Sequence, residues 1–104
     1  MRSEVLKGHV DLLLLATLRR GPLHGYGLVE ALRSTSAGTF DLAEGTVYPA
    51  LYRLEAAGLL SSSWTKANGR RRRVYELTNR GRGELARERD EWQAFAHAVE
   101  AVVT

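Results

Sequence analysis

Apolar side chains recur at helical spacing in three stretches of the first part of the chain. The leucines between positions 5 and 20 predict a largely buried helix, which Gly21-Pro22 ends. A short second helix is expected over residues 24–35, and a third over residues 43–57. Pro49 would remove one backbone hydrogen bond there, so this third helix is expected to begin later or to bend at that position.

Beyond Gly58 the pattern changes to two extended runs and then returns to a helix. Residues 59–65 and 71–77 predict two strands, and the Asn68-Gly69 dipeptide between them strongly favours a hairpin turn. Thr78 can cap a helix that continues to position 103, a rod of roughly 37 Å at about 1.5 Å per residue.

This order of elements predicts a mainly α fold with a small β-hairpin. We expect residues 1–78 to form a winged helix-turn-helix and residues 79–104 to form a long C-terminal dimerisation helix. The sequence contains no internal repeat, and no linker separates the two parts. One compact unit is therefore expected.

Composition excludes several classes of protein. A chain of 104 residues with 44% hydrophobic and 26% charged residues is ordinary for one small globular domain. Because it has no cysteine, it is neither a disulfide scaffold nor a thiol enzyme nor a Cys-ligated zinc finger. Its longest apolar stretch, within residues 12–18, is too short for a signal-peptide core or a membrane span. A cytoplasmic protein that does not contact a membrane is expected.

The formal net charge of +3 is distributed unevenly. Residues 1–63 carry six basic and six acidic groups, residues 64–82 carry seven basic and one acidic group, and residues 83–104 carry two basic and five acidic groups. The middle block is a candidate for binding a polyanion. Its arginines at positions 70–73 flank the expected turn, where guanidinium groups can pair with phosphates or enter a narrow minor groove. Alternatively, they form a solvated loop or pair with the acidic last helix.

The third helix has a second candidate surface outside its apolar stripe. Small, hydroxyl-bearing and cationic side chains there suit contacts with phosphates and base edges. They are Gly45, Thr46, Tyr48, Pro49, Tyr52 and Arg53. Alternatively, the two tyrosines pack against the second helix. The glycines beside His24 and Tyr26 would permit close approach of the backbone to a phosphate or to a neighbouring helix.

Neither catalytic nor metal-binding chemistry has a local signature. His9, His24 and His97 fall on three different expected elements, and the sequence has no HExxH or GxSxG motif. We therefore expect no enzyme activity, no metal and no cofactor.

The last helix carries an apolar seam that only Glu88 interrupts. Its members step by threes and fours, and they are Leu85, Trp92, Phe95, Val99 and Val102. Such a seam predicts a second copy of the chain as partner, although the helix could instead fold back over its own domain. A pair of Trp92 side chains at a two-fold axis would flank a small planar aromatic effector or serve only as an interface anchor.

Five segments together carry a resemblance to a known family. They are the leucines at 12–15, the GPLHGYG segment at 21–27, EGTVYPALYRLE at 44–55, GRRRRVY at 69–75, and Leu77-Thr78 with Gly81. In these segments the chain resembles PadR-family transcriptional regulators, the phenolic-acid-responsive repressors of bacteria, and specifically their short subgroup.

The resemblance implies a winged-helix dimer in which each third helix enters a major groove and each wing reaches the adjacent minor groove. It places the recognition surface on Thr46, Tyr48, Pro49, Tyr52 and Arg53, and the wing on residues 69–72. In multidrug-responsive relatives an indole fourteen residues beyond the Leu-Thr threonine stacks on drugs, and Trp92 has that spacing here.

The expected function is therefore sequence-specific transcriptional regulation. The chain is expected to repress by binding a palindromic double-stranded DNA operator as a homodimer, with half-sites about one helical turn apart, and an effector at Trp92 would release it. The alternatives are a module that docks an acidic protein and a dimer that sequesters a small molecule. The expected DNA-binding residues are His24, Tyr26, Thr46, Tyr48, Pro49, Tyr52, Arg53, Asn68, Gly69, Arg70, Arg71 and Arg72.

Overall fold

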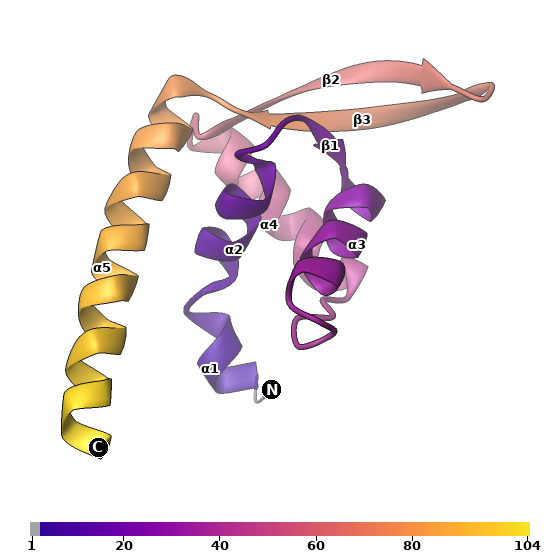
Figure 1. Cartoon of the computed structure of the whole chain (residues 1–104). Helices are drawn as coiled ribbons and strands as arrows, with labels where there is room; N and C mark the ends of the chain where they lie inside the picture. The colour runs from indigo at the N-terminus through magenta and orange to yellow at the C-terminus, as the bar shows by residue number, and fades with distance from the viewer. Residues whose placement is uncertain (1–2) are drawn as a thin grey trace.

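The computed structural model describes residues 3–104, so the first two positions of the expected 1–78 unit lie outside the described residues. Helices dominate, and three short strands form an antiparallel sheet (Figure 1). The elements are α1 (Ser3–Lys7), α2 (Val10–Leu18), β1 (Leu23–His24), α3 (Gly25–Thr35), α4 (Glu44–Ala56), β2 (Leu60–Ala67), β3 (Arg70–Leu77) and α5 (Asn79–Val103). The expected mainly α winged-helix fold with a long C-terminal helix is confirmed.

The first expected helix is divided in two. The helix predicted over residues 5–20 is interrupted at Gly8 and His9, between α1 and α2. His9 leaves the helical conformation, and its Nδ1 lies 2.7 Å from the Val5 carbonyl oxygen that a continuous helix would pair with the His9 N–H. Glycine is also a poor helix former, so the break coincides with the weakest position of the leucine-rich stretch.

The wing is a long hairpin closed by two residues. Asn68 and Gly69 have φ values of 53° and 75°, as a type I′ turn requires. Both strands extend to this turn. The hairpin connection therefore has two residues, 68 and 69, in place of the five residues expected, 66–70. Figure 1 shows the hairpin projecting well beyond the helices.

The sheet contains a strand that the sequence pattern did not reveal. β1 pairs with β3, with Leu23 opposite Tyr75 and His24 opposite Val74, in the order β1-β3-β2. Two residues are too few to show alternation, which is why β1 was missed. Its pairing attaches the start of α3 to the base of the wing.

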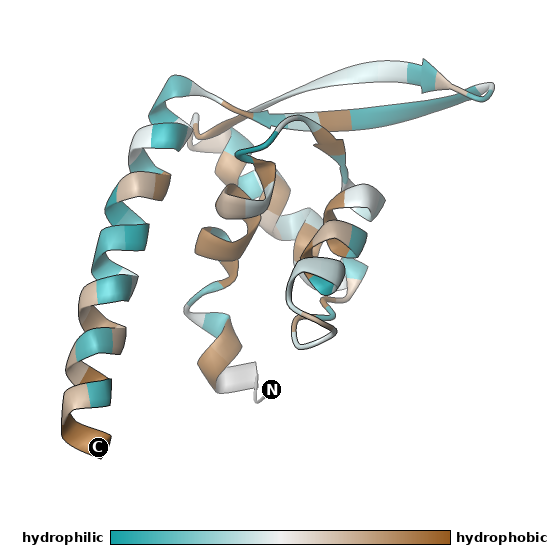
Figure 2. Cartoon of the chain, viewed as in Figure 1, coloured by the Kyte–Doolittle hydropathy of each residue, from teal (hydrophilic) through white to brown (hydrophobic). Residues whose placement is uncertain are grey.

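The hydrophobic core lies between α2, α3, α4 and the base of the sheet. Nine side chains in it have less than 2% of their surface exposed, and each contributes on the order of 1.5–3 kcal/mol by leaving water. They are Leu14, Leu15, Leu18, Leu28, Val47, Leu51, Leu54, Leu60 and Tyr75. Figure 2 shows α2 as largely hydrophobic, in agreement with the buried helix expected there.

Helix α4 begins at Glu44 and includes Pro49 without starting later, so the expected later start is wrong. Proline at this position has no N–H to donate to the Gly45 carbonyl. Both residues are exposed, which leaves that carbonyl on the outer surface of α4.

The start of α5 is secured by a side-chain cap. Thr78 Oγ1 accepts a hydrogen bond of 3.0 Å from Gly81 N and donates one of 2.7 Å to the Gly58 carbonyl. The predicted cap is therefore confirmed. From this point α5 extends away from the sheet alongside α2 and α1 (Figure 1). Within residues 3–104, no helix combines the length and the apolarity that crossing a bilayer demands.

Candidate nucleic-acid interface

The start of α3, one side of α4 and the wing enclose a groove of about 680 Å³, which we call the wing groove. Aromatic and cationic side chains line it almost entirely. They are His24, Tyr26, Tyr48, Tyr52, Trp64, Arg70, Arg71, Arg72, Arg73 and Tyr75. The structure thus brings together seven of the expected DNA-binding residues from four different elements.

Two of the four arginines of the wing are held by polar contacts within the winged-helix part. Arg72 Nη1 lies 2.8 Å from His24 Nε2, and Arg73 pairs with Glu55 on α4 at 3.2 Å. Among the described side chains, none of the four arginines forms an ion pair with α5, so the alternative of pairing with the acidic last helix is wrong. Arg70 and Arg71 remain exposed near the tip of the wing.

Trp64 is a groove residue that the sequence analysis missed. Its indole is 56% exposed and lies opposite Arg73 in the β2–β3 pairing. The guanidinium of Arg71 lies 4.7 Å from the ring centroid and that of Arg73 lies 5.8 Å away, within cation–π range. Counting the pairs outward from the Asn68-Gly69 turn would have placed these three residues on one face of the hairpin.

Tyr48 has a structural role beside its place in the groove. A β-carbon on Gly25 would lie 2.6 Å from the Tyr48 ring, so this glycine allows α3 and α4 to approach closely. The expected alternative, packing against the second helix, therefore applies to Tyr48 but not to Tyr52, which is 54% exposed. Burial, together with the charge of Glu44, raises the pKa of Tyr48, so its hydroxyl stays protonated and can donate a hydrogen bond.

Tyr75 adds a buried polar group to the groove wall. Its side chain is 1% exposed, and its hydroxyl has no hydrogen-bond partner among the described residues. Burial raises the pKa of this hydroxyl, although the charge of Arg73 acts in the opposite direction. Leaving such a group unpaired costs about 1–3 kcal/mol of stability.

The remaining expected residues of α4 lie apart from the groove. Thr46 and Pro49 are exposed near the start of the helix, but they do not line the wing groove. Arg53 points toward α2, where Asp11 accepts hydrogen bonds from both of its terminal nitrogens at 2.9 and 2.6 Å. These bonds raise the pKa of Arg53 and hold its guanidinium in an ion pair instead of leaving it free.

The apolar seam of α5 is only partly used within the chain. Leu85 is 9% exposed and belongs to the core, so it packs within its own domain. The other seam residues are exposed: Trp92 by 42%, Phe95 by 59%, Val99 by 41% and Val102 by 85%. The alternative that α5 folds back over its own domain therefore holds for Leu85 and in part for Trp92, whose ring meets His9, but not for Val99 and Val102.

Trp92 borders a small cleft between α5 and the break that separates α1 from α2. The cleft has a volume of about 200 Å³ and is lined by Gly8, His9, Leu12, Glu88, Glu91, Trp92 and Phe95. The His9 ring meets the indole edge to face, with centroids 5.2 Å apart. Burial and the nearby carboxylates of Glu84, Asp11 and Glu91 raise the pKa of Glu88, while Arg87 lowers it.

Comparisons with known proteins agree with this geometry. Residues 14–87 match the model of the transcriptional regulator PadR-like family. The chain is 36% identical over 96 residues to transcriptional regulator Rv3488 of Mycobacterium tuberculosis, an alignment that covers 92% of this chain and 87% of that protein.

Solved structures show the same fold. A transcriptional regulator from Clostridium thermocellum has a TM-score of 0.90 at 27% identity, covering 98% of this chain and all of the other. A PadR-family regulator from Eggerthella lenta has a TM-score of 0.82 at 30% identity, covering 96% of this chain and 86% of that one. The resemblance drawn from the motifs is confirmed, and so is the expectation of a regulator and not an enzyme. The chain belongs to the PadR-like family of transcriptional regulators.

Proposed function

We propose that the chain is a cytoplasmic repressor that binds a palindromic operator as a homodimer and is released by a small planar aromatic molecule. The wing groove is the observation that carries this proposal. It combines four arginines with five aromatic side chains in one concave surface along a projecting hairpin. Guanidinium groups and aromatic hydroxyls of this kind bind phosphates and base edges.

The charge of the wing supports docking on a duplex. Residues 60–77, the two wing strands and their turn, carry five basic groups against one acidic group, and Arg70 and Arg71 are exposed beside the turn. A wing of this length can follow the DNA backbone into a minor groove while α4 faces the major groove. Asn68 and Gly69 would then form the tip that approaches the sugar-phosphate backbone most closely.

The exposed half of the α5 seam supports a homodimer. Trp92, Phe95, Val99 and Val102 lie on one face of the helix and together form a larger apolar patch than scattered surface residues do. Pairing this face with its copy around a two-fold axis would bury the patch and present two wing grooves to one duplex.

The cleft at Trp92 supports the effector part of the proposal. It lies where α5 meets the α1–α2 break, so a planar ring inserted beside the indole would separate α5 from α2. Such a movement would change the spacing of the two grooves in the dimer and lower the affinity for the operator.

The experiment that tests the proposal selects bound sequences from random duplexes and then measures the salt dependence of binding. Enrichment of a palindrome with half-sites about one helical turn apart is expected. Replacing Arg70 and Arg71 with alanine should reduce the slope of log affinity against log salt by up to about 0.9 for each phosphate that the protein no longer neutralises. The matched control replaces Arg82 and Arg89, both on α5, with alanine. This variant loses the same two positive charges as the wing variant but leaves the wing unchanged.

The alternative, docking of an acidic protein, predicts a different result. In that case duplex DNA would not be enriched above random sequence, and an acidic protein partner would compete for the arginines of the wing. Equal effects of the wing and the α5 arginine changes would also contradict the assignment of the groove as the DNA surface. A dimer that only sequesters small molecules would bind aromatic compounds without showing any sequence preference.

A further inference from the structure

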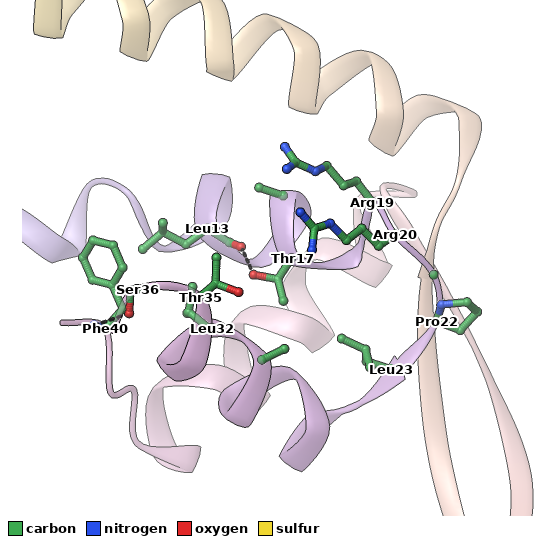
Figure 3. Close-up of a pocket in the computed structure, with 13 residues that line it drawn as sticks. Leu13, Thr17, Arg19, Arg20, Pro22, Leu23, Leu32, Thr35, Ser36 and Phe40 are labelled. Atoms are coloured by element: carbon green, nitrogen blue, oxygen red, sulfur yellow. Dashed lines mark hydrogen bonds between the residues drawn. The ribbon is translucent and has the colours of Figure 1, made fainter. Parts of the chain in front are cut away.

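A third pocket, of about 520 Å³, lies between α2 and α3 and shares no lining residue with the wing groove or the Trp92 cleft. We call it the α2–α3 pocket. Figure 3 shows Phe40 and Ser36 at one end and Pro22 and Leu23 at the other. Its volume is in the range of pockets that take small organic ligands.

The inner wall of the α2–α3 pocket offers few free hydrogen-bonding groups. Thr17 Oγ1 donates to the Leu13 carbonyl at 2.7 Å, and Ser36 Oγ accepts from the Phe40 N–H at 2.9 Å. The rest of the wall is mainly hydrocarbon, from Leu13, Ala16, Leu23, Ala31, Leu32 and Phe40. The part of a ligand that lies against this wall must therefore be apolar.

Two cations lie at the rim of the pocket, at the end of α2 and beside Thr17 (Figure 3). Arg19 and Arg20 belong to its lining, follow the end of α2 and are exposed. Neither forms an ion pair with a side chain that the structure describes, whereas Arg33, Arg53, Arg73 and Arg87 all do. Two unpaired guanidinium groups beside an apolar wall complement an anionic head group, and their planar geometry suits a carboxylate.

We propose that the α2–α3 pocket binds a single-chain amphipathic carboxylate, with its hydrocarbon chain between α2 and α3 and its head group on Arg19 and Arg20. An alkanoate of medium length matches both the apolar wall and the charge at the rim. The pocket is thus a second ligand site, separate from the cleft at Trp92.

Two elements connect this pocket to the wing groove. Leu23 on β1 lines the α2–α3 pocket, and the residue opposite it on β3, Tyr75, lines the wing groove. Helix α3 carries Leu32 in the pocket and Tyr26 in the groove. A ligand that shifts α3 or β1 would therefore change the affinity for DNA, and by linkage DNA would change the affinity for the ligand. This coupling rests on the proposed function, whereas binding itself does not.

Binding is tested on the full chain without DNA. Decanoate, kept below its micelle concentration, is titrated into nitrogen-15-labelled protein while amide chemical shifts are recorded. Saturating shifts are expected at Leu13, Ala31 and Leu32, without comparable shifts at Trp92. Decanol lacks the charge and acetate lacks the chain, so both should bind at least about tenfold more weakly.

Variants separate the charge from the apolar wall. Arg19→Gln with Arg20→Gln should weaken decanoate binding at least about tenfold, while the matched pair Arg82→Gln with Arg89→Gln should leave it unchanged. Ala31→Leu should fill the pocket and abolish binding, and Ala16→Leu provides a second filling variant if the first unfolds. Equal binding of decanol, indifference to the arginine changes, or no saturating binding by the native chain would overturn the proposal.

The coupling has its own measurement. Fluorescence anisotropy of a selected duplex should show that decanoate changes the dissociation constant for the native chain but not for Ala31→Leu. An unchanged constant in the native chain would refute the coupling. If no duplex is selected at all, the proposed DNA function fails, while the result of the decanoate titration still decides whether the pocket binds an amphipathic carboxylate.

Discussion

Arg53 and Asp11 connect α4 to α2 through two hydrogen bonds, with Nη1 2.9 Å from Oδ2 and Nη2 2.6 Å from Oδ1. The two residues are 42 positions apart in the chain. The family resemblance places Arg53 on the DNA-reading surface. Because Asp11 already binds its guanidinium group, any contact between Arg53 and DNA would compete with Asp11.

Asp11→Ala should therefore strengthen DNA binding, because it frees the Arg53 guanidinium and removes a negative charge nearby. We expect an increase of about two- to fivefold on a selected duplex, measured by fluorescence anisotropy. The Arg53 side chain is 60% exposed, so the decrease in unfolding free energy should stay below about 1 kcal/mol. Asp90→Ala, an equal charge change on α5, is the control. Weaker DNA binding by Asp11→Ala would show that the pair itself positions α4.

Trp64 should contribute to DNA affinity by holding the guanidinium groups of Arg71 and Arg73 over its ring. Trp64→Ala is expected to weaken duplex binding several-fold, and Trp64→Phe by less, since a cation–π contact is worth about 0.5–2 kcal/mol. The chain has two tryptophans, so Trp92→Phe leaves Trp64 as the only indole emitter. In that background its fluorescence should change when duplex is added. Unchanged emission and unchanged affinity would remove Trp64 from the interface.

Two glycines near the start of α5 should respond in opposite directions to replacement by alanine. A β-carbon on Gly81 would lie 2.0 Å from the Leu59 carbonyl oxygen, whereas one on Gly83 would meet nothing within 4 Å. Gly81→Ala should therefore destabilise the fold by more than about 2 kcal/mol, because the backbone must move. Gly83→Ala should stabilise it by about 0.5–1 kcal/mol through its better helix propensity. Urea unfolding measures both, and a shift of the same sign in the two variants would contradict this explanation.

The outer half of α5 should hold the proposed dimer together. Phe95→Glu places a charge in the exposed seam and should convert the dimer to a monomer at micromolar concentration, as sedimentation velocity would show. Gln93→Glu makes the same change in charge outside the seam and should leave the mass unchanged. A native chain that sediments as a monomer would exclude the proposed two-fold arrangement.

Local patterns were sufficient for most of the elements. The apolar spacing of α3 and α4, the Asn68-Gly69 turn and the Thr78 cap each depend on residues close together in the chain, and the structure agrees with all of them. The break before α2 was missed because apolar periodicity does not register a side chain that replaces one backbone hydrogen bond, as His9 does with Val5.

Contacts between distant segments were decided by the tertiary structure. The sequence alone predicted a basic wing, a polar surface on the third helix and an apolar seam on the terminal helix, because charge, turn chemistry and periodicity are local properties. Only the packed fold showed that Asp11 binds Arg53, that the guanidinium groups of Arg71 and Arg73 lie over the Trp64 ring, and that Leu85 is buried while Phe95 is exposed. Each of these depends on where other elements pack, and one-dimensional spacing does not contain that information.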